Sequence, residues 1–165
     1  MLAAVSSATA AVWKHEGTNI TKPVKFKVTG GELFETGTGG MLCEIHATVV
    51  TEGGSVGEVT WFAATGCTGF GDLAGCSVMA SQAIGLPWVV DVNTSTLTIT
   101  KWRVQRAFDA GCAVSELDKT ISKVTAVPDV PAAISELEII GKTGSYSMIG
   151  LLSVAAPNAG TYGIG

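Results

Sequence analysis

The chain has 165 residues, of which only 15% are charged, and its formal net charge is −4. Soluble domains carry about 25% charged residues, so this composition predicts either a small secreted protein or a subunit whose surface neighbours cover. The largest cluster of basic residues is Lys22, Lys25 and Lys27, and a cluster this small argues against nucleic-acid binding. The apolar stretches are shorter than the roughly 18 residues of a membrane-spanning helix, so we expect no membrane partner.

Residues 1–13 carry no charge and are expected to form an N-terminal arm. They lack the basic start of a secretory signal peptide, so we expect no export signal in this chain. Val24 to Thr29 alternates apolar residues with lysines, which predicts a strand with one buried face. Gly30-Gly31 predicts a hairpin-type break, after which Glu32 to Thr36 pairs back. Leu42 to Thr51 is expected to be a long strand.

Residues 57–100 show the most regular strand pattern of the chain. Val59 shares a face with Trp61 if the strand alternates without interruption. The sequence Gly85-Leu86-Pro87-Trp88 predicts a corner between two strands. Farther along, Ile99 and Trp102 fall on opposite faces of a regular strand, so we expect a β-bulge near Lys101.

Ala113 to Lys119 is a candidate helical turn with Ser115 as its N-cap, and the remaining elements are strands. Thr120 to Val127 and Ile134 to Ile140 are predicted strands, separated by a Pro-Asp-Val-Pro segment at 128–131 that blocks regular pairing. The whole pattern predicts an all-β chain with nine to eleven short strands, arranged as a β-sandwich with Greek-key or jelly-roll features. We expect one sandwich domain over residues 14–142, followed by an uncharged C-terminal arm or strand over 143–165.

The four cysteines, Cys43, Cys67, Cys76 and Cys112, allow three disulfide pairings. Two of them lie in expected strands and two in glycine-containing loops, which favours Cys43–Cys76 with Cys67–Cys112. The alternative is four reduced cysteines in the core, as assembly in a cytosol requires. No C-x-x-C motif is present, and the two histidines complete no zinc spacing.

No pattern assembles a catalytic site. His46 lies near Glu44 at outward parity, but neither a nucleophile nor an orienting partner accompanies them. No serine has a G-x-S-x-G context, and Gly66 to Gly71 lacks the lysine and helix of a phosphate loop. We therefore expect no enzyme, no cofactor and no metal ion. A calcium site formed through loops by Asp72, Asp91 and Asp109 would lack the D-x-D-x-D spacing, so we expect these aspartates to cap turns instead.

A series of short motifs runs in order through the middle of the chain: Gly40–Thr48, Gly57–Thr60, Cys67, Leu73–Cys76, Gly85–Trp88, Leu97–Thr100, Gly111-Cys112 and Ile134–Ile140. In this order the segment resembles a group of small uncharacterised β-proteins encoded widely in actinobacteria. Those proteins usually carry secretion signals. The resemblance, without such a signal here, implies the same sandwich in a setting where export is unnecessary, such as a phage virion. It implies no activity.

Low charge, apolar ends and the absence of a chemical site predict a non-enzymatic structural subunit, above all a capsid decoration protein of a tailed phage. Its partners would be other copies of itself or a major capsid protein, in a virion assembled in the host cytoplasm; a filament or tail subunit is the nearby variant. We expect assembly contacts at Leu2, Val5, Val12, Met148, Ile149, Leu151, Leu152 and Tyr162.

The alternative function is a secreted binding module for carbohydrate or a cell surface. Trp61, Trp88 and Trp102 would form its stacking platform, although strand alternation favours core packing for two of the three. This alternative predicts formed disulfides and an extracellular location.

Overall fold

The computed structural model describes residues 10–155 and 160–165. Within these ranges the regular elements are strands, which confirms the all-β prediction. They are β1 (Trp13–His15), β2 (Thr18–Asn19), β3 (Val24–Glu35), β4 (Gly39–Thr51), β5 (Val56–Gly71), β6 (Val78–Ala83), β7 (Trp88–Val92), β8 (Leu97–Phe108), β9 (Glu116–Pro128), β10 (Glu136–Thr143), β11 (Tyr146–Ala155) and β12 (Tyr162–Ile164). A search of the described residues for a helix that could span a membrane found none.

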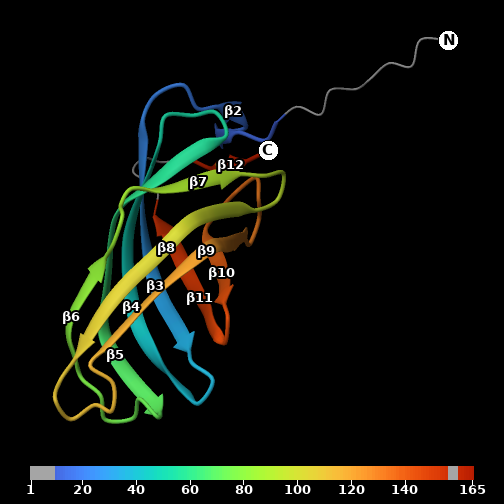
Figure 1. The fold of residues 1–165 in the computed structure, drawn as a ribbon. Helices are drawn as coiled ribbons and strands as arrows, with labels where there is room; N and C mark the ends of the chain where they lie inside the picture. The colour runs from blue at the N-terminus through green and yellow to red at the C-terminus, as the bar shows by residue number, and fades with distance from the viewer. Residues whose placement is uncertain (1–9, 156–159) are drawn as a thin grey trace.

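Eight of the strands close into an antiparallel barrel (Figure 1). Neighbours follow the order β8-β7-β5-β4-β3-β11-β10-β9, and β9 then pairs with β8 from Leu97↔Ala126 to Ala107↔Glu116. β6 adds a ninth strand against the second half of β8. This closure corrects the sandwich prediction, because the β8–β9 ladder joins strands that two separate sheets would leave as edges.

A small sheet in the order β12-β1-β2 lies across one end of the barrel (Figure 1). We call this sheet the lid, and the barrel half beneath it the lid half. The Ile134 backbone N donates to Tyr162 O at 2.8 Å, and Ile164 N donates to Pro131 O at 2.7 Å. The loop between β9 and β10 therefore ties the lid to the barrel. The opposite half, which contains the β3–β4 turn, is the hairpin half.

β3 continues through Gly30-Gly31 without a break, so the predicted hairpin at this point is wrong. β4 and β11 flank it along most of its length. Gly30 has a packing reason, because a Cβ there would lie 2.1 Å from Leu151 O. The uninterrupted strand keeps its alternation and places Glu32 inside the barrel, where it is 1% exposed.

β5 changes face at a bulge between the pairs Thr48↔Trp61 and Val49↔Val59. Val59 and Phe62 both point inward, whereas Trp61 is 52% exposed. The prediction that Val59 and Trp61 share a face is therefore wrong. One inserted residue reverses the parity of everything after it, and alternation alone does not reveal the insertion.

β8 also changes face, at Lys101, but without an inserted residue. Its pairing with β9 keeps one register from Thr100↔Lys123 to Trp102↔Ile121, and Lys101 itself takes a left-handed φ of 59°. The irregularity expected near Lys101 is thus a backbone kink. It is not a β-bulge, in which two residues of one strand would face a single residue of the other. It brings Ile99 and Trp102 onto the same inner face.

Candidate functional site

An apolar cavity of about 250 Å³ lies beneath the lid. Seven of the eight barrel strands contribute inward side chains to its wall, among them Ile99 from β8 and Val154 from β11; Trp13 and Tyr162 line it from the lid. None of the described residues that line it is charged. For comparison, an apolar protein cavity of about 150 Å³ stays dry and takes up benzene. The interior of this barrel therefore has room for one small organic molecule.

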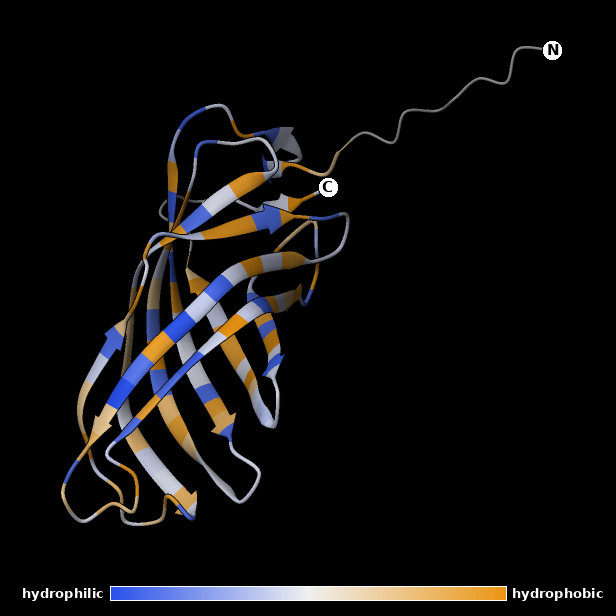
Figure 2. Ribbon diagram, in the orientation of Figure 1, coloured by the Kyte–Doolittle hydropathy of each residue, from blue (hydrophilic) through white to orange (hydrophobic). Residues whose placement is uncertain are grey.

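Several inward positions of the lid half carry small or medium side chains, which leave room for the cavity. Ala126 on β9 and Val90 on β7 are buried and line it. Strand alternation, visible as colour changes along several strands in Figure 2, directs such residues into the barrel. Inward residues of this size do not fill an eight-stranded barrel completely.

Aromatic rings of the lid and of β3 form the roof. Trp13 stacks on Phe26 with the ring centroids 5.6 Å apart, and Tyr162 meets the same phenylalanine edge to face at 5.2 Å. His15 stacks on Tyr162 at 4.3 Å. Two polar atoms in this roof, Trp13 Nε1 and His15 Nε2, are buried and have no hydrogen-bond partner among the described residues.

The β9–β10 loop completes the wall and is held by one carboxylate. Asp129 accepts hydrogen bonds from the Ser135 hydroxyl and from the backbone N of Ser135 and Glu136, at 3.0 and 3.1 Å for the two backbone donors. These bonds, led by that from the Ser135 hydroxyl, hold the pKa of Asp129 well below its usual value. Asp129 thereby orders Ala133 to Ser135, which line the cavity.

In the hairpin half, a buried ion pair occupies part of the barrel interior. Arg106 on β8 donates to Glu32 on β3 at 2.5 Å, and both side chains are almost fully buried. Burial raises the pKa of the Glu32 carboxyl, and the Arg106 charge opposes that rise. Glu32 Oε1 and Arg106 Nε have no partner among the described residues. This pair was missed at the sequence level because the glycine pair predicted a turn before Glu32; an unbroken alternation from Val24 would have placed Glu32 on the inner face.

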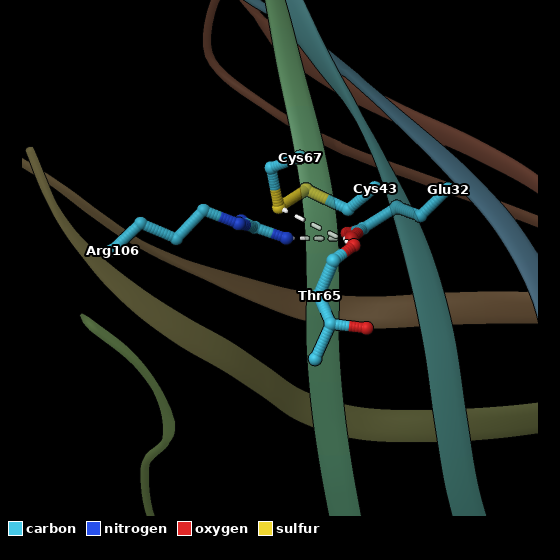
Figure 3. The surroundings of a disulfide bond; sticks show 5 residues. All are labelled: Glu32, Cys43, Thr65, Cys67 and Arg106. Atoms are coloured by element: carbon cyan, nitrogen blue, oxygen red, sulfur yellow. Dashed lines mark hydrogen bonds and ion pairs between the residues drawn. A yellow bond between two sulfur atoms is a disulfide. The ribbon is translucent and has the colours of Figure 1, made fainter. Parts of the chain in front are cut away.

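The disulfides pair differently from the prediction. Cys43 bonds to Cys67, and Cys76 bonds to Cys112, so the favoured Cys43–Cys76 and Cys67–Cys112 pairing is wrong, and neither pair is reduced. Figure 3 shows the first disulfide beside the Glu32–Arg106 pair. Cys67 lies within β5, next to β4, rather than in a loop. A register irregularity around Cys43 places the two cysteines side by side on adjacent strands.

The other residues considered for chemistry do not come together. His46 contacts Glu44 at 2.9 Å on the exposed outer face. Asp72 accepts from the Thr38 hydroxyl, and Asp109 accepts from the backbone N of Ser77, so both bind loop groups. Of the three tryptophans, Trp88 is 1% and Trp102 is 3% exposed. These two pack with Phe62 in the core and form no sugar-stacking platform with Trp61.

The expected assembly residues divide between the core and the surface. β11 alternates, so Met148 and Leu152 are buried while Ile149 and Leu151 are 44% and 61% exposed. Tyr162 is buried in the lid and Val12 is half-buried; Leu2 and Val5 lie outside the described residues. Ladder pairing sets four aliphatic residues in one row across β4, β3, β11 and β10, which we call the aliphatic row: Leu42, Leu33, Ile149 and Ile140.

Sequence reasoning did not find the cavity, because its wall draws one or two residues from each of many strands. No short motif of the chain marks it. Comparison of the chain with protein-family models, with curated proteins and with solved structures gave no match.

Proposed function

We propose that this protein binds a small, uncharged, mostly apolar molecule in the cavity beneath the lid. The observation that carries the proposal is the apolar space of about 250 Å³ inside a closed barrel, with no charged side chain among its described lining residues. Interiors of eight-stranded barrels and barrel mouths are common places for a single small ligand. A polymer such as a polysaccharide does not fit a space of this size.

The lining supplies the binding energy through burial of apolar area. Each Å² of apolar surface removed from water contributes roughly 25 cal/mol, and the aromatic roof of Trp13, Phe26 and Tyr162 adds large, rigid contact faces. A charged ligand would lose its hydration without meeting an opposite charge. The expected ligand class is therefore neutral.

The disulfides support an oxidising setting for this function. All four cysteines are bonded, and disulfides persist in secreted and periplasmic proteins but are rare in a reducing cytosol. We therefore propose an extracellular location in preference to assembly in a host cytoplasm. This follows the secreted alternative, with a small apolar ligand in place of carbohydrate.

The test is calorimetric titration of the disulfide-bonded protein with 2-ethylnaphthalene, an uncharged apolar probe. We expect saturable binding of one molecule per chain. Ala126→Phe, which places a ring in the cavity, should abolish it. The matched control Ala63→Phe adds the same ring at a half-buried position of β5 that does not line the cavity, and should bind like the parent. No saturable binding by the parent, or unchanged binding by Ala126→Phe, contradicts the proposal.

A second candidate function, a structural subunit, is favoured by the aliphatic row. Exposed apolar patches mark interaction sites in soluble proteins, and Ile140 has Glu138 and Lys142 on either side of it along β10. In a two-fold pairing of two copies about an axis along the row, each Glu138 faces Lys142 of the other copy. Light scattering should then show dimers or larger species that Ile149→Asp disperses and the neighbouring outward Ser153→Asp does not. A monomer at all concentrations contradicts this candidate.

A further inference from the structure

We infer that the cavity opens to solvent at a rim formed by Ser135, Gly160 and Thr161, and that its ligand is an apolar body with one uncharged polar end, such as a hydroxyl group, which stays at this rim. This inference rests on the proposed function and narrows its ligand class. It distinguishes an amphiphilic ligand, whose polar end remains in water, from a carboxylic acid of the same shape.

The exposed residues of the cavity wall lie in one place. Among the described lining residues they are Ser135, Gly160 and Thr161, and the others are buried or half-buried. These three belong to the β9–β10 loop and to the segment that leads into β12. A wall residue that is also exposed leaves only its own thickness between the cavity and bulk water. We therefore place the opening between these two segments.

The backbone pairing of the two segments also stops at this point. The hydrogen bonds that tie the lid to the barrel run antiparallel, and one further step would pair Ser135 with Thr161. Instead, the carbonyl of Ser135 accepts from Val154 N at 2.8 Å, and that of Thr161 accepts from Glu16 N at 2.7 Å. The segments thus separate where the exposed lining residues begin.

Acidic side chains flank the rim. Asp129 and Glu16 each accept a hydrogen bond from a rim residue, and the exposed Glu136 directly follows Ser135. An anionic end group at this place would meet like charges, which repel it. The rim therefore disfavours a carboxylate end, whereas a hydroxyl end meets no such repulsion.

The basic side chains of the lid do not offset these charges. Lys14 extends toward Gly165, at the end of β12 that is farther from the rim. His15 Nε2 is buried, and a Cβ on Gly160 would lie 2.4 Å from it, so this nitrogen lies behind the backbone of the rim. A ligand end in the opening therefore has acidic groups as its charged neighbours.

A hydroxyl end at the rim keeps its contact with water. Inside the cavity it would lose that water and face a mostly apolar wall, which is unfavourable for an unpaired hydroxyl. The apolar body therefore supplies the affinity, and the polar end determines which way round the ligand lies.

The first test compares the dissociation constants of 2-ethylnaphthalene and 2-(2-naphthyl)ethanol, which adds a hydroxyl group to the same body. We expect the two values to agree within about five-fold, because the hydroxyl stays hydrated; burial of an unpaired hydroxyl would weaken binding by more than that. If neither probe binds, the proposed function fails. If only the hydrocarbon binds, or the alcohol loses more than five-fold, the polar end at the rim is overturned and apolar binding stands.

The second test uses 2-naphthylacetate, which carries an anionic end on the same body. We expect it to bind about three-fold more weakly than the alcohol at neutral pH, the size of one repulsion between exposed charges. Glu16→Gln, which keeps an oxygen for the backbone N of Thr161, should reduce this difference. The control Glu58→Gln, at an exposed position of β5 that does not line the cavity, should leave it unchanged. Equal affinities of acid and alcohol, or equal effects of the two variants, overturn the preference for an uncharged end.

The third test locates the opening in the parent protein. The probe is 2-(2-naphthyl)ethanol with a nitroxide ring attached through its oxygen, and the readout is paramagnetic broadening of backbone amide signals. We expect the strongest broadening at Ser135 and Thr161, and none at Thr38 in the β3–β4 turn. Failure of this probe to bind where 2-ethylnaphthalene binds, or broadening centred away from the rim, overturns the opening and leaves apolar binding in place.

Discussion

The two halves of one barrel are built from different side chains. Next to the cavity, but not lining it, Phe62, Trp88 and Trp102 pack with ring centroids 4.9 to 5.3 Å apart. A buried ion pair and a disulfide fill the space beyond them. In the lid half the same wall encloses a cavity of about 250 Å³. The difference teaches that one continuous ladder can hold a packed region that stabilises the fold and an unfilled region that is free to bind.

Single strands show the contrast most clearly. β9 carries Ile121 inward in the hairpin half and Ala126 inward in the lid half, and β11 carries Met148 and then Val154. β9 pairs with β8 in both halves, whereas it pairs with β10 only from Val124 to Pro128. On these two strands the smaller inward side chains of the lid half leave more space than those of the hairpin half.

The largest expected effect on stability comes from breaking the ion pair of the hairpin half. Arg106→Met leaves Glu32 buried without its partner and should lower the free energy of unfolding by about 3–5 kcal/mol, measured by urea denaturation. Adding Glu32→Leu should recover most of that loss, because no unpaired charge then remains. A double variant as unstable as Arg106→Met would contradict this account of the pair.

Removing the Cys43–Cys67 disulfide of the hairpin half should have a similar or smaller effect on stability. Cys43→Ala with Cys67→Ala should lower the free energy of unfolding by about 2–5 kcal/mol. The dissociation constant of 2-ethylnaphthalene should stay within about two-fold, because neither cysteine lines the cavity. A large loss of affinity in a variant that remains folded would show that the halves are not separable in this way.

A matched pair of small substitutions sharpens the comparison. Ile121→Val in the hairpin half should lower the free energy of unfolding by about 1 kcal/mol. Ile99→Val should cost less, because Ile99 lines the cavity and already lacks some packing partners. Thermal or urea unfolding measures both. Equal costs would mean that the wall around Ile99 is as closely packed as that around Ile121.

The smallest effect is expected from pH. The pKa of Asp129 is lowered in the folded protein, so its hydrogen bonds stabilise the loop above the unfolded value of about 3.9. That contribution is lost as pH falls from about 4 towards the lower folded value. Probe affinity should weaken over this range, and Asp129→Ala should be weaker already at neutral pH and vary less on acidification. Identical pH profiles of probe affinity in the parent and in Asp129→Ala would contradict the role of Asp129.

Local alternation was enough to predict most of the strands and much of their inner faces, although Glu116 to Lys119, predicted as a helical turn, belongs to β9. Phe26 and Val28 point inward as the alternation of their strand indicates. Closure was not predictable, because it also needs the ladder between β3 and β11, which pairs residues far apart in the chain, such as Leu33 and Ile149. The exposure of Trp61 depends on a bulge that leaves no mark in the polar pattern. To predict the disulfide pairing, one would have needed to know that β5 extends past Cys67.

The central claim is that the ligand lies inside the barrel, and intermolecular nuclear Overhauser effects test it directly. The experiment uses the methyl-labelled, disulfide-bonded protein with 2-ethylnaphthalene. We predict contacts from the probe to the methyl groups of Leu97, Ile99 and Val154, which line the cavity, and none to Met148 in the hairpin half. Contacts confined to the exposed Ile149 and Leu151, or no contacts at all, would contradict binding in the cavity.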